Sequence, residues 1–141
     1  MFLLDTNVIS ELRKARAGRA DPNVLAWFNE CDANTCYLSV ISVLELELGI
    51  LQVERRDERQ GSALRNWLEN QVLPEFESRL LPIDQRVAKV CAGLHVPDPR
   101  SERNAFIAAS ALVNGMAVVS RNVGDFDGSG VKLINPWEGA L

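Results

Sequence analysis

Three carboxylates that follow short apolar runs are the side chains best suited to chemistry in this 141-residue chain. Asp5 ends the run 2–4, Glu45 comes after the run 36–40, and Asp125 follows the run 116–120. Clustered carboxylates repel one another unless a cation compensates their charge. Oxygen ligands with retained waters suit Mg²⁺, and one or two such ions can generate hydroxide and stabilise a phosphodiester transition state. Together, these acids predict metal-assisted hydrolysis.

Each acid also has a simpler local interpretation. Asp5 precedes Thr6 and could favour a helix N-terminus through the helix dipole. Glu45 lies three residues after Ser42, which matches a capping box. Asp125 could be a turn residue. These roles stay open for each residue alone, and the combination of the three is more specific than any member.

The elements that would position these acids alternate between strands and helices. Alternation with short, continuous apolar strands predicts an α/β sandwich, with a mostly parallel sheet flanked by helices, in one domain over residues 1–141. Ligands of such sheets lie beyond the carboxyl ends of the strands, where all three acids fall. The mixed charge run 54–59 is interpreted as a solvated face or turn. Strands are expected at 2–4, 36–40, 80–83, 116–120 and 131–134, and helices at 7–12, from Pro22, from Ser42, at 64–74, from Asp84 to Leu94, and at 102–114.

Composition excludes several classes of protein. The formal charge of −4 and the pI of about 5.0 argue against a general nucleic-acid coat. No apolar run is long enough for a membrane span, and the amino terminus does not have the pattern of a secretory signal. Three cysteines without a CxxC pair favour a reducing cytoplasm. The single histidine, His95, is expected to be structural or exposed, so zinc or Ser-His-Asp chemistry is disfavoured.

Several blocks of the sequence carry a family resemblance, in the family's order. They are Leu3–Leu12, Leu38–Leu46, Asn104–Ala111, Ser120–Phe126 and Val131–Trp137. On these blocks the chain resembles PIN-domain ribonucleases, and specifically VapC-type toxins of type II toxin–antitoxin pairs. The resemblance implies a single small PIN-like α/β domain and an endoribonuclease that depends on Mg²⁺, with Mn²⁺ as the alternative. It also implies three partners: a VapB-type antitoxin, an RNA substrate and a second copy in a homodimer.

The resemblance further implies a metal-binding and catalytic site of four acidic positions. Asp5, Glu45 and Asp125 match three of them, and Asn104 stands where the fourth aspartate is expected. The supporting residues implied beside them are Thr6, Asn7, Ser120 and Asn122.

Asn104 is the main departure from the family pattern. Asparagine keeps the shape and one oxygen ligand of aspartate but loses the negative charge, so cation affinity and activity should fall. The residue is either natural or a replacement that silences the enzyme, and we favour an impaired form of an active family. A catalytically silent module that binds RNA or antitoxin is the alternative. Phosphate-handling folds with an acid after the first strand are disfavoured, because Asn7 occupies the place of their second acid.

A basic segment follows the first predicted helix. Its cations could neutralise the phosphates of RNA locally, despite the net charge of −4. A solvated loop is an equal alternative. The residues concerned are Arg13, Lys14, Arg16 and Arg19.

Overall fold

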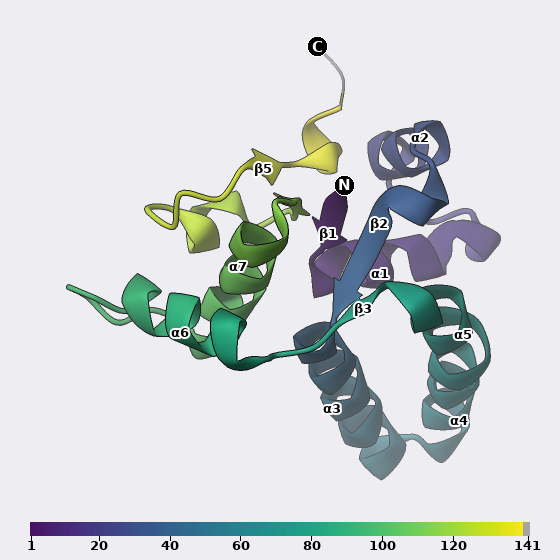
Figure 1. The fold of residues 1–141 in the computed structure, drawn as a ribbon. Coiled ribbons are helices and arrows are strands. Elements are labelled where there is room, and N and C mark those ends of the chain that lie inside the picture. Colours follow the sequence, from purple (N-terminus) through teal and green to yellow (C-terminus); the bar gives the residue numbers. More distant parts are fainter. Residues whose placement is uncertain (140–141) are drawn as a thin grey trace.

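The computed structural model describes residues 1–139, so the last two residues of the predicted domain lie outside the described part. Its strands pair in parallel in one sheet, in the order β3-β2-β1-β4-β5 (Figure 1). The five predicted strands are confirmed, and four of them are shorter than predicted because only the residues in register form ladder hydrogen bonds. The strands are β1 (Phe2–Leu4), β2 (Cys36–Ser39), β3 (Leu80–Leu81), β4 (Ala117–Val119) and β5 (Leu133–Ile134).

Seven α-helices in the described residues connect and cover these strands. Four of them begin behind an aspartate whose side chain accepts a backbone hydrogen bond, which satisfies an otherwise unpaired N–H group of the first turn. No helix within residues 1–139 is long and apolar enough to cross a membrane. The helices are α1 (Thr6–Leu12), α2 (Pro22–Glu30), α3 (Val40–Arg56), α4 (Glu58–Trp67), α5 (Leu73–Phe76), α6 (Gln85–Leu94) and α7 (Glu102–Asn114).

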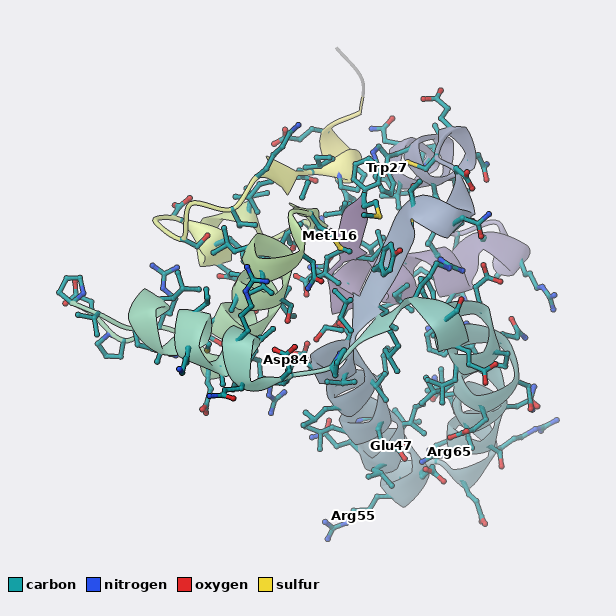
Figure 2. All side chains as sticks on the ribbon, in the orientation of Figure 1. Trp27, Glu47, Arg55, Arg65, Asp84 and Met116 are labelled. Carbon is teal, nitrogen blue, oxygen red and sulfur yellow. The ribbon has the colours of Figure 1, made fainter. Side chains whose placement is uncertain are left out.

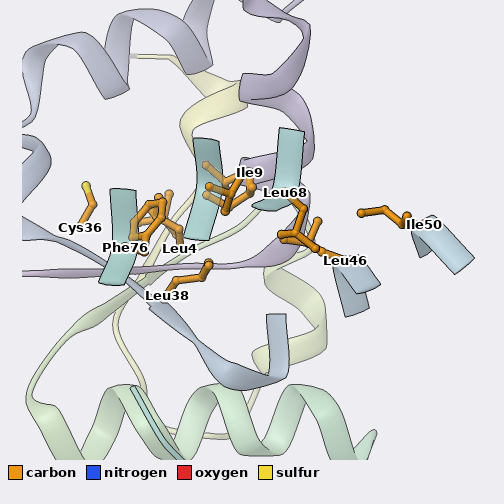
Figure 3. Close-up of a cluster of buried hydrophobic side chains, with 11 residues drawn as sticks. Leu4, Ile9, Cys36, Leu38, Leu46, Ile50, Leu68 and Phe76 are labelled. Atoms are coloured by element: carbon orange, nitrogen blue, oxygen red, sulfur yellow. The ribbon is translucent and has the colours of Figure 1, made fainter. Parts of the chain in front are cut away.

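The two faces of β1 enter different apolar clusters. Leu4 packs with residues of α1, α3 and α5, including Ile9, Leu46 and Phe76 (Figure 3). Leu3 packs on the other face, in a cluster that includes Ile107 of α7. Successive residues of a strand point to opposite faces, so a strand that is buried on both faces requires helices on both sides of the sheet. The predicted α/β sandwich is confirmed.

The start of α3 differs from the prediction. A helix capped by Ser42 was expected, but α3 begins at Val40. Ser39 has extended backbone angles, and its side chain accepts a hydrogen bond from the amide of Ile41 at 3.0 Å. The strand therefore runs directly into the helix. Ser42 is a buried residue inside the helix instead of its cap.

The predicted helix over 64–74 is divided into three parts. α4 ends at Trp67, a π-helical turn spans Leu68–Val72, and α5 begins at Leu73. The residues at both junctions have right-handed helical backbone angles, so the helix continues through the π-helical turn, and Pro74 follows directly after that turn.

Residues 55–59 of the charge run 54–59 are exposed, as its interpretation as a solvated face predicted, and the extended residue Asp57 links α3 to α4 within it. The two helices form a hairpin. Arg65 of α4 pairs with Glu47 and Glu54 of α3, and the side chains of Glu47 and Arg65 face one another in Figure 2.

Candidate functional site

The sheet register places Asp5 and Ser120 side by side. Leu4 pairs with Val119 across β1 and β4, and the amide of Asp5 donates to the carbonyl of Val119 at 2.9 Å. Asp5 and Ser120 are thus the first residues beyond the carboxyl ends of two neighbouring parallel strands. This is the edge at which such sheets bind ligands.

The carboxylate of Asp5 is buried and hydrogen-bonded on both oxygens. Its Oδ1 accepts from the backbone N–H of Thr6 at 2.8 Å, and its Oδ2 accepts from the Ser120 hydroxyl at 2.7 Å. Asp5 is therefore the N-cap of α1. The helix expected at 7–12 begins one residue earlier, because Thr6 is its first helical residue and the Thr6 hydroxyl donates to Glu45. The capping interpretation of Asp5 is correct, and it does not compete with a ligand role because Asp5 also borders a cavity.

Burial raises the pKa of Asp5 above the ordinary value of an aspartate. The hydrogen bonds from Ser120 and Thr6 oppose this rise, whereas the negative charges of Glu45 and Asp125 add to it. Desolvation and like charges both disfavour the ionised form. A bound cation would relieve both effects, so the electrostatics of this carboxylate suit a metal ligand.

Glu45 reaches the same place from α3. The Thr6 hydroxyl donates to Glu45 Oε1 at 2.8 Å, and the hydroxyl oxygens of Thr6 and Ser42 are 2.9 Å apart. The capping-box interpretation of Glu45 is thus wrong. Ser42 lies inside α3 and not at its N-terminus, and its hydroxyl contacts that of Thr6. The other oxygen of Glu45 lies 3.7 Å from Nη1 of Arg103.

A cavity of about 340 Å³ collects these side chains. Asp5, Glu45 and Asn104 line it, and Asn104 comes from the first turn of α7. Asp125 lies outside the lining, exposed in the 3₁₀ turn Val123–Phe126. Its charge still acts on Asp5. The remaining residues of the lining are Thr6, Asn7, Ser10 and Asn122.

The polar side chains predicted to support the site form one network. Ser120 Oγ accepts from Asn7 Nδ2 at 3.1 Å and from the amide of Asn122 at 3.0 Å, while it donates to Asp5. Asn7 also accepts from the amide of Arg121 at 3.3 Å. These contacts hold the loop after β4 against the start of α1. They fix the orientation of the Asp5 carboxylate.

The basic segment is not gathered at the cavity. Residues 13–17 form a 3₁₀ turn, in which Lys14 pairs with Glu11 at 3.2 Å. Arg13 lies over the ring of Trp67 and lines an adjoining cavity of about 240 Å³ together with Thr6 and Glu45. Arg16 and Arg19 are exposed.

The structure also assigns roles to two residues outside the predicted site, Arg103 and His95. Arg103 was missed by the sequence analysis, although its position beside Asn104 in the first turn of α7 was a usable signal. His95 caps the end of α6, and its Nδ1 accepts from the amide of Arg100 at 3.2 Å. His95 therefore has the structural role expected of it.

The side chains around the cavity offer oxygen donors to a divalent cation. Within residues 1–139, no group of three or more His, Cys, Asp or Glu side chains is arranged to hold a metal ion. The cavity offers two carboxylates and the amide of Asn104, all of them oxygen donors. Oxygen donors with room for water suit Mg²⁺ and Mn²⁺. The residues therefore fit a hard cation, with one negative charge fewer than three acids would supply.

Comparisons with known proteins agree with this geometry. Residues 2–127 match the PIN domain family. The chain is 39% identical to the VapC ribonuclease Y4jK of Sinorhizobium fredii, over 99% of this chain and 100% of that protein. It is 35% identical to Toxin FitB of Neisseria gonorrhoeae, over 97% and 99% of the two chains. The crystal structure of FitAcB from the same organism superposes with a TM-score of 0.87 at 33% identity, covering 97% of this chain and 99% of that chain.

Proposed function

This chain belongs to the PIN domain family, and from that premise we propose that it is the toxin of a type II toxin–antitoxin pair, acting as a metal-dependent endoribonuclease on RNA in the cytoplasm. Two similarities support the proposal: the relative from Sinorhizobium fredii is named a ribonuclease and that from Neisseria gonorrhoeae a toxin. The site supports it independently, because buried and half-buried acids meet at the ligand-binding edge of a parallel sheet.

Asp5, Glu45 and Asn104 are the residues that would hold Mg²⁺ or Mn²⁺, with Asp125 acting from outside the cavity. When bound, such an ion supplies Lewis-acid assistance to water and to the phosphodiester. Ser120 and Thr6 keep the Asp5 carboxylate oriented and favour its ionised form. Glu45 has one oxygen facing Arg103 and would accept a proton from water or orient it.

The observation that carries the proposal is the meeting of three residues at one cavity: Asp5 from the end of β1, Glu45 from α3 and Asn104 from α7. Asn104 is proposed to impair the chain by removing one ligand charge. The test is Mn²⁺-dependent cleavage of RNA by the purified protein and by Asn104→Asp. The variant should cut at least about tenfold faster, because an added carboxylate strengthens cation binding.

Asn114→Asp is the matched control, since it makes the same chemical change at the other end of α7. It should leave cleavage at the level of the unaltered chain. If Asn104→Asp binds no divalent ion and cuts no RNA, the nuclease assignment is wrong.

The second candidate is a silent PIN module that binds RNA or antitoxin without cleavage. The presence of only two carboxylates on the cavity favours it. The same comparison separates the two proposals, because a silent module would bind RNA with unchanged affinity in both forms and would cleave it in neither.

An antitoxin segment is the partner proposed for the groove beside the site. The acid-lined cavity shares Thr6, Ser10 and Glu45 with the cavity that Arg13 borders. That cavity in turn shares Arg13 and Trp67 with a third, of about 250 Å³, which has mainly apolar walls. A bound segment along these cavities would end at the acids and block RNA from them.

A homodimer is the proposed assembly. Leu44, Leu48 and Leu51 are spaced along one side of α3 and are 49%, 38% and 53% exposed. An apolar stripe of this kind on a helix next to the site is suited to pairing with its own copy.

A further inference from the structure

Arg103 places a positive charge beside Glu45, one of the acids that line the cavity. It is the second residue of α7, directly before Asn104, and its side chain is 49% exposed. Its Nη1 lies 3.7 Å from Glu45 Oε2, which belongs to α3. The pair therefore joins two elements across the site, and the guanidinium is long and exposed enough to leave it.

The pairing with Arg103 affects the oxygen of Glu45 that is best able to bind a cation. Glu45 Oε1 already accepts a hydrogen bond from the hydroxyl of Thr6 at 2.8 Å, so Oε2 keeps more free acceptor capacity for a cation. The guanidinium of Arg103 is the cation paired with that oxygen. A divalent ion that used Glu45 as a ligand would have to share it with the guanidinium or displace the guanidinium.

The charges around the cavity also indicate that Arg103 offsets the acids of the site. Asp5 and Glu45 are the two acids on its wall, and Asn104 contributes no charge. Arg103 compensates one of the two acids from within the chain. The site is thus partly neutralised before any metal binds.

We propose that Arg103 is the internal counter-cation of this site: it holds Glu45 when no divalent ion is bound and lowers the affinity of the site for that ion. The inference rests on the proposed metal site. It makes Arg103 a positioning residue, which acts through Glu45.

The test is the dissociation constant of Mn²⁺ alone, measured on the purified full chain by equilibrium dialysis with detection of free Mn²⁺. Arg103→Gln removes the charge and should bind Mn²⁺ about tenfold more tightly, as Coulomb's law gives for a unit charge several ångströms from a divalent ion in a water-like dielectric. Arg103→Lys keeps the charge and should bind Mn²⁺ as weakly as the unaltered chain. Both substitutions are at an exposed position, and thermal unfolding verifies that each variant is folded.

Arg55→Gln is the matched control, because it removes the same charge at the far end of α3, where Arg55 points away from the rest of the molecule (Figure 2). It should leave the Mn²⁺ affinity unchanged. An equal gain for Arg55→Gln and Arg103→Gln would assign the effect to net charge and overturn the inference. An equal gain for Arg103→Lys and Arg103→Gln would also overturn it, because the positive charge would then not be the cause.

Asn104→Asp serves as the reference for the metal site itself. If Asn104→Asp tightens Mn²⁺ binding and Arg103→Gln does not, the counter-cation inference fails and the proposed metal site stands. If no form of the chain binds Mn²⁺, both fail together.

Discussion

Asp5 couples its own ionisation to the stability of the fold. Folding removes its carboxylate from water and raises its pKa, so the folded chain holds a proton over a pH range in which the unfolded chain has lost it. Stability from this residue is therefore fully present below the ordinary pKa of an aspartate. It is lost as the pH rises through the raised pKa of the folded state.

This coupling predicts how Asp5→Asn changes the pH dependence of unfolding. The substitution removes the titrating group, so the melting temperature of the metal-free protein minus that of the variant should increase as the pH falls from 7 towards 4. Thermal unfolding in the presence of EDTA at several pH values measures this difference. A difference that stays constant, or that decreases with falling pH, would contradict the account.

Single residues differ in how far the sequence could predict them. Asp5, Glu45 and Asn104 were identified because strand ends and family blocks point to them. The pairs Ser42–Thr6 and Arg103–Glu45 join residues that are far apart in the sequence, and no local pattern encodes those contacts.

At the scale of elements, the α3–α4 hairpin depends on one close approach. A Cβ atom at Gly61 would lie 2.4 Å from Glu54 Cγ and 2.6 Å from Glu54 Cα. The second of these atoms is backbone and cannot turn aside. Gly61 is therefore required by the packing of the two helices.

Gly61→Ala should destabilise the chain by about 1–3 kcal/mol, the usual cost of overpacking. Gly49→Ala is the matched substitution within a helix, because a Cβ atom there would have no neighbour within 4 Å. It should stabilise the chain by about 0.5–1 kcal/mol through the lower flexibility of alanine. Urea unfolding of both variants measures the two free energies. If the two substitutions changed the free energy of unfolding in the same direction, the α3–α4 hairpin would be packed more loosely than described.

Element boundaries were less predictable than element types. The apolar pattern over 64–74 is continuous, so the sequence gives no signal for the π-helical turn at Leu68–Val72. The start of α3 was misplaced because Ser39 and Ser42 are equally good caps by residue type. The backbone conformation of Ser39, set by its place at the end of β2, decides between them.

At the scale of the whole molecule, the proposed homodimer predicts a specific sensitivity to charge. Leu48→Lys places a cation in the middle of the apolar stripe of α3 and should convert the protein to a monomer. Light scattering coupled to size-exclusion chromatography measures the mass. Val96→Lys makes a similar change at a residue that is 74% exposed beyond α6, and it should leave the dimer intact. A monomeric unaltered chain, or a Leu48→Lys dimer of unchanged stability, would contradict the proposal.

The net charge of −4 is compatible with action on RNA. An acidic chain can act on RNA if a few of its carboxylates are gathered around a cation, and here two of them share one cavity with Asn104. The α/β architecture followed from the order of strands and helices, because every parallel connection needs a crossover. The charge of the site depends on single residues such as Asn104 and Arg103, whose identity no property of the whole chain could predict.

Asn104 is proposed to occupy the position of a missing metal-binding acid in the site built around Asp5. The most direct measurement is Mn²⁺-dependent RNA cleavage by Asn104→Asp, compared with the double variant Asp5→Asn/Asn104→Asp. We predict that the single variant cleaves RNA and that removal of the Asp5 charge abolishes the gain, because both residues serve one cation. Cleavage of equal rate in the two variants would contradict the claim.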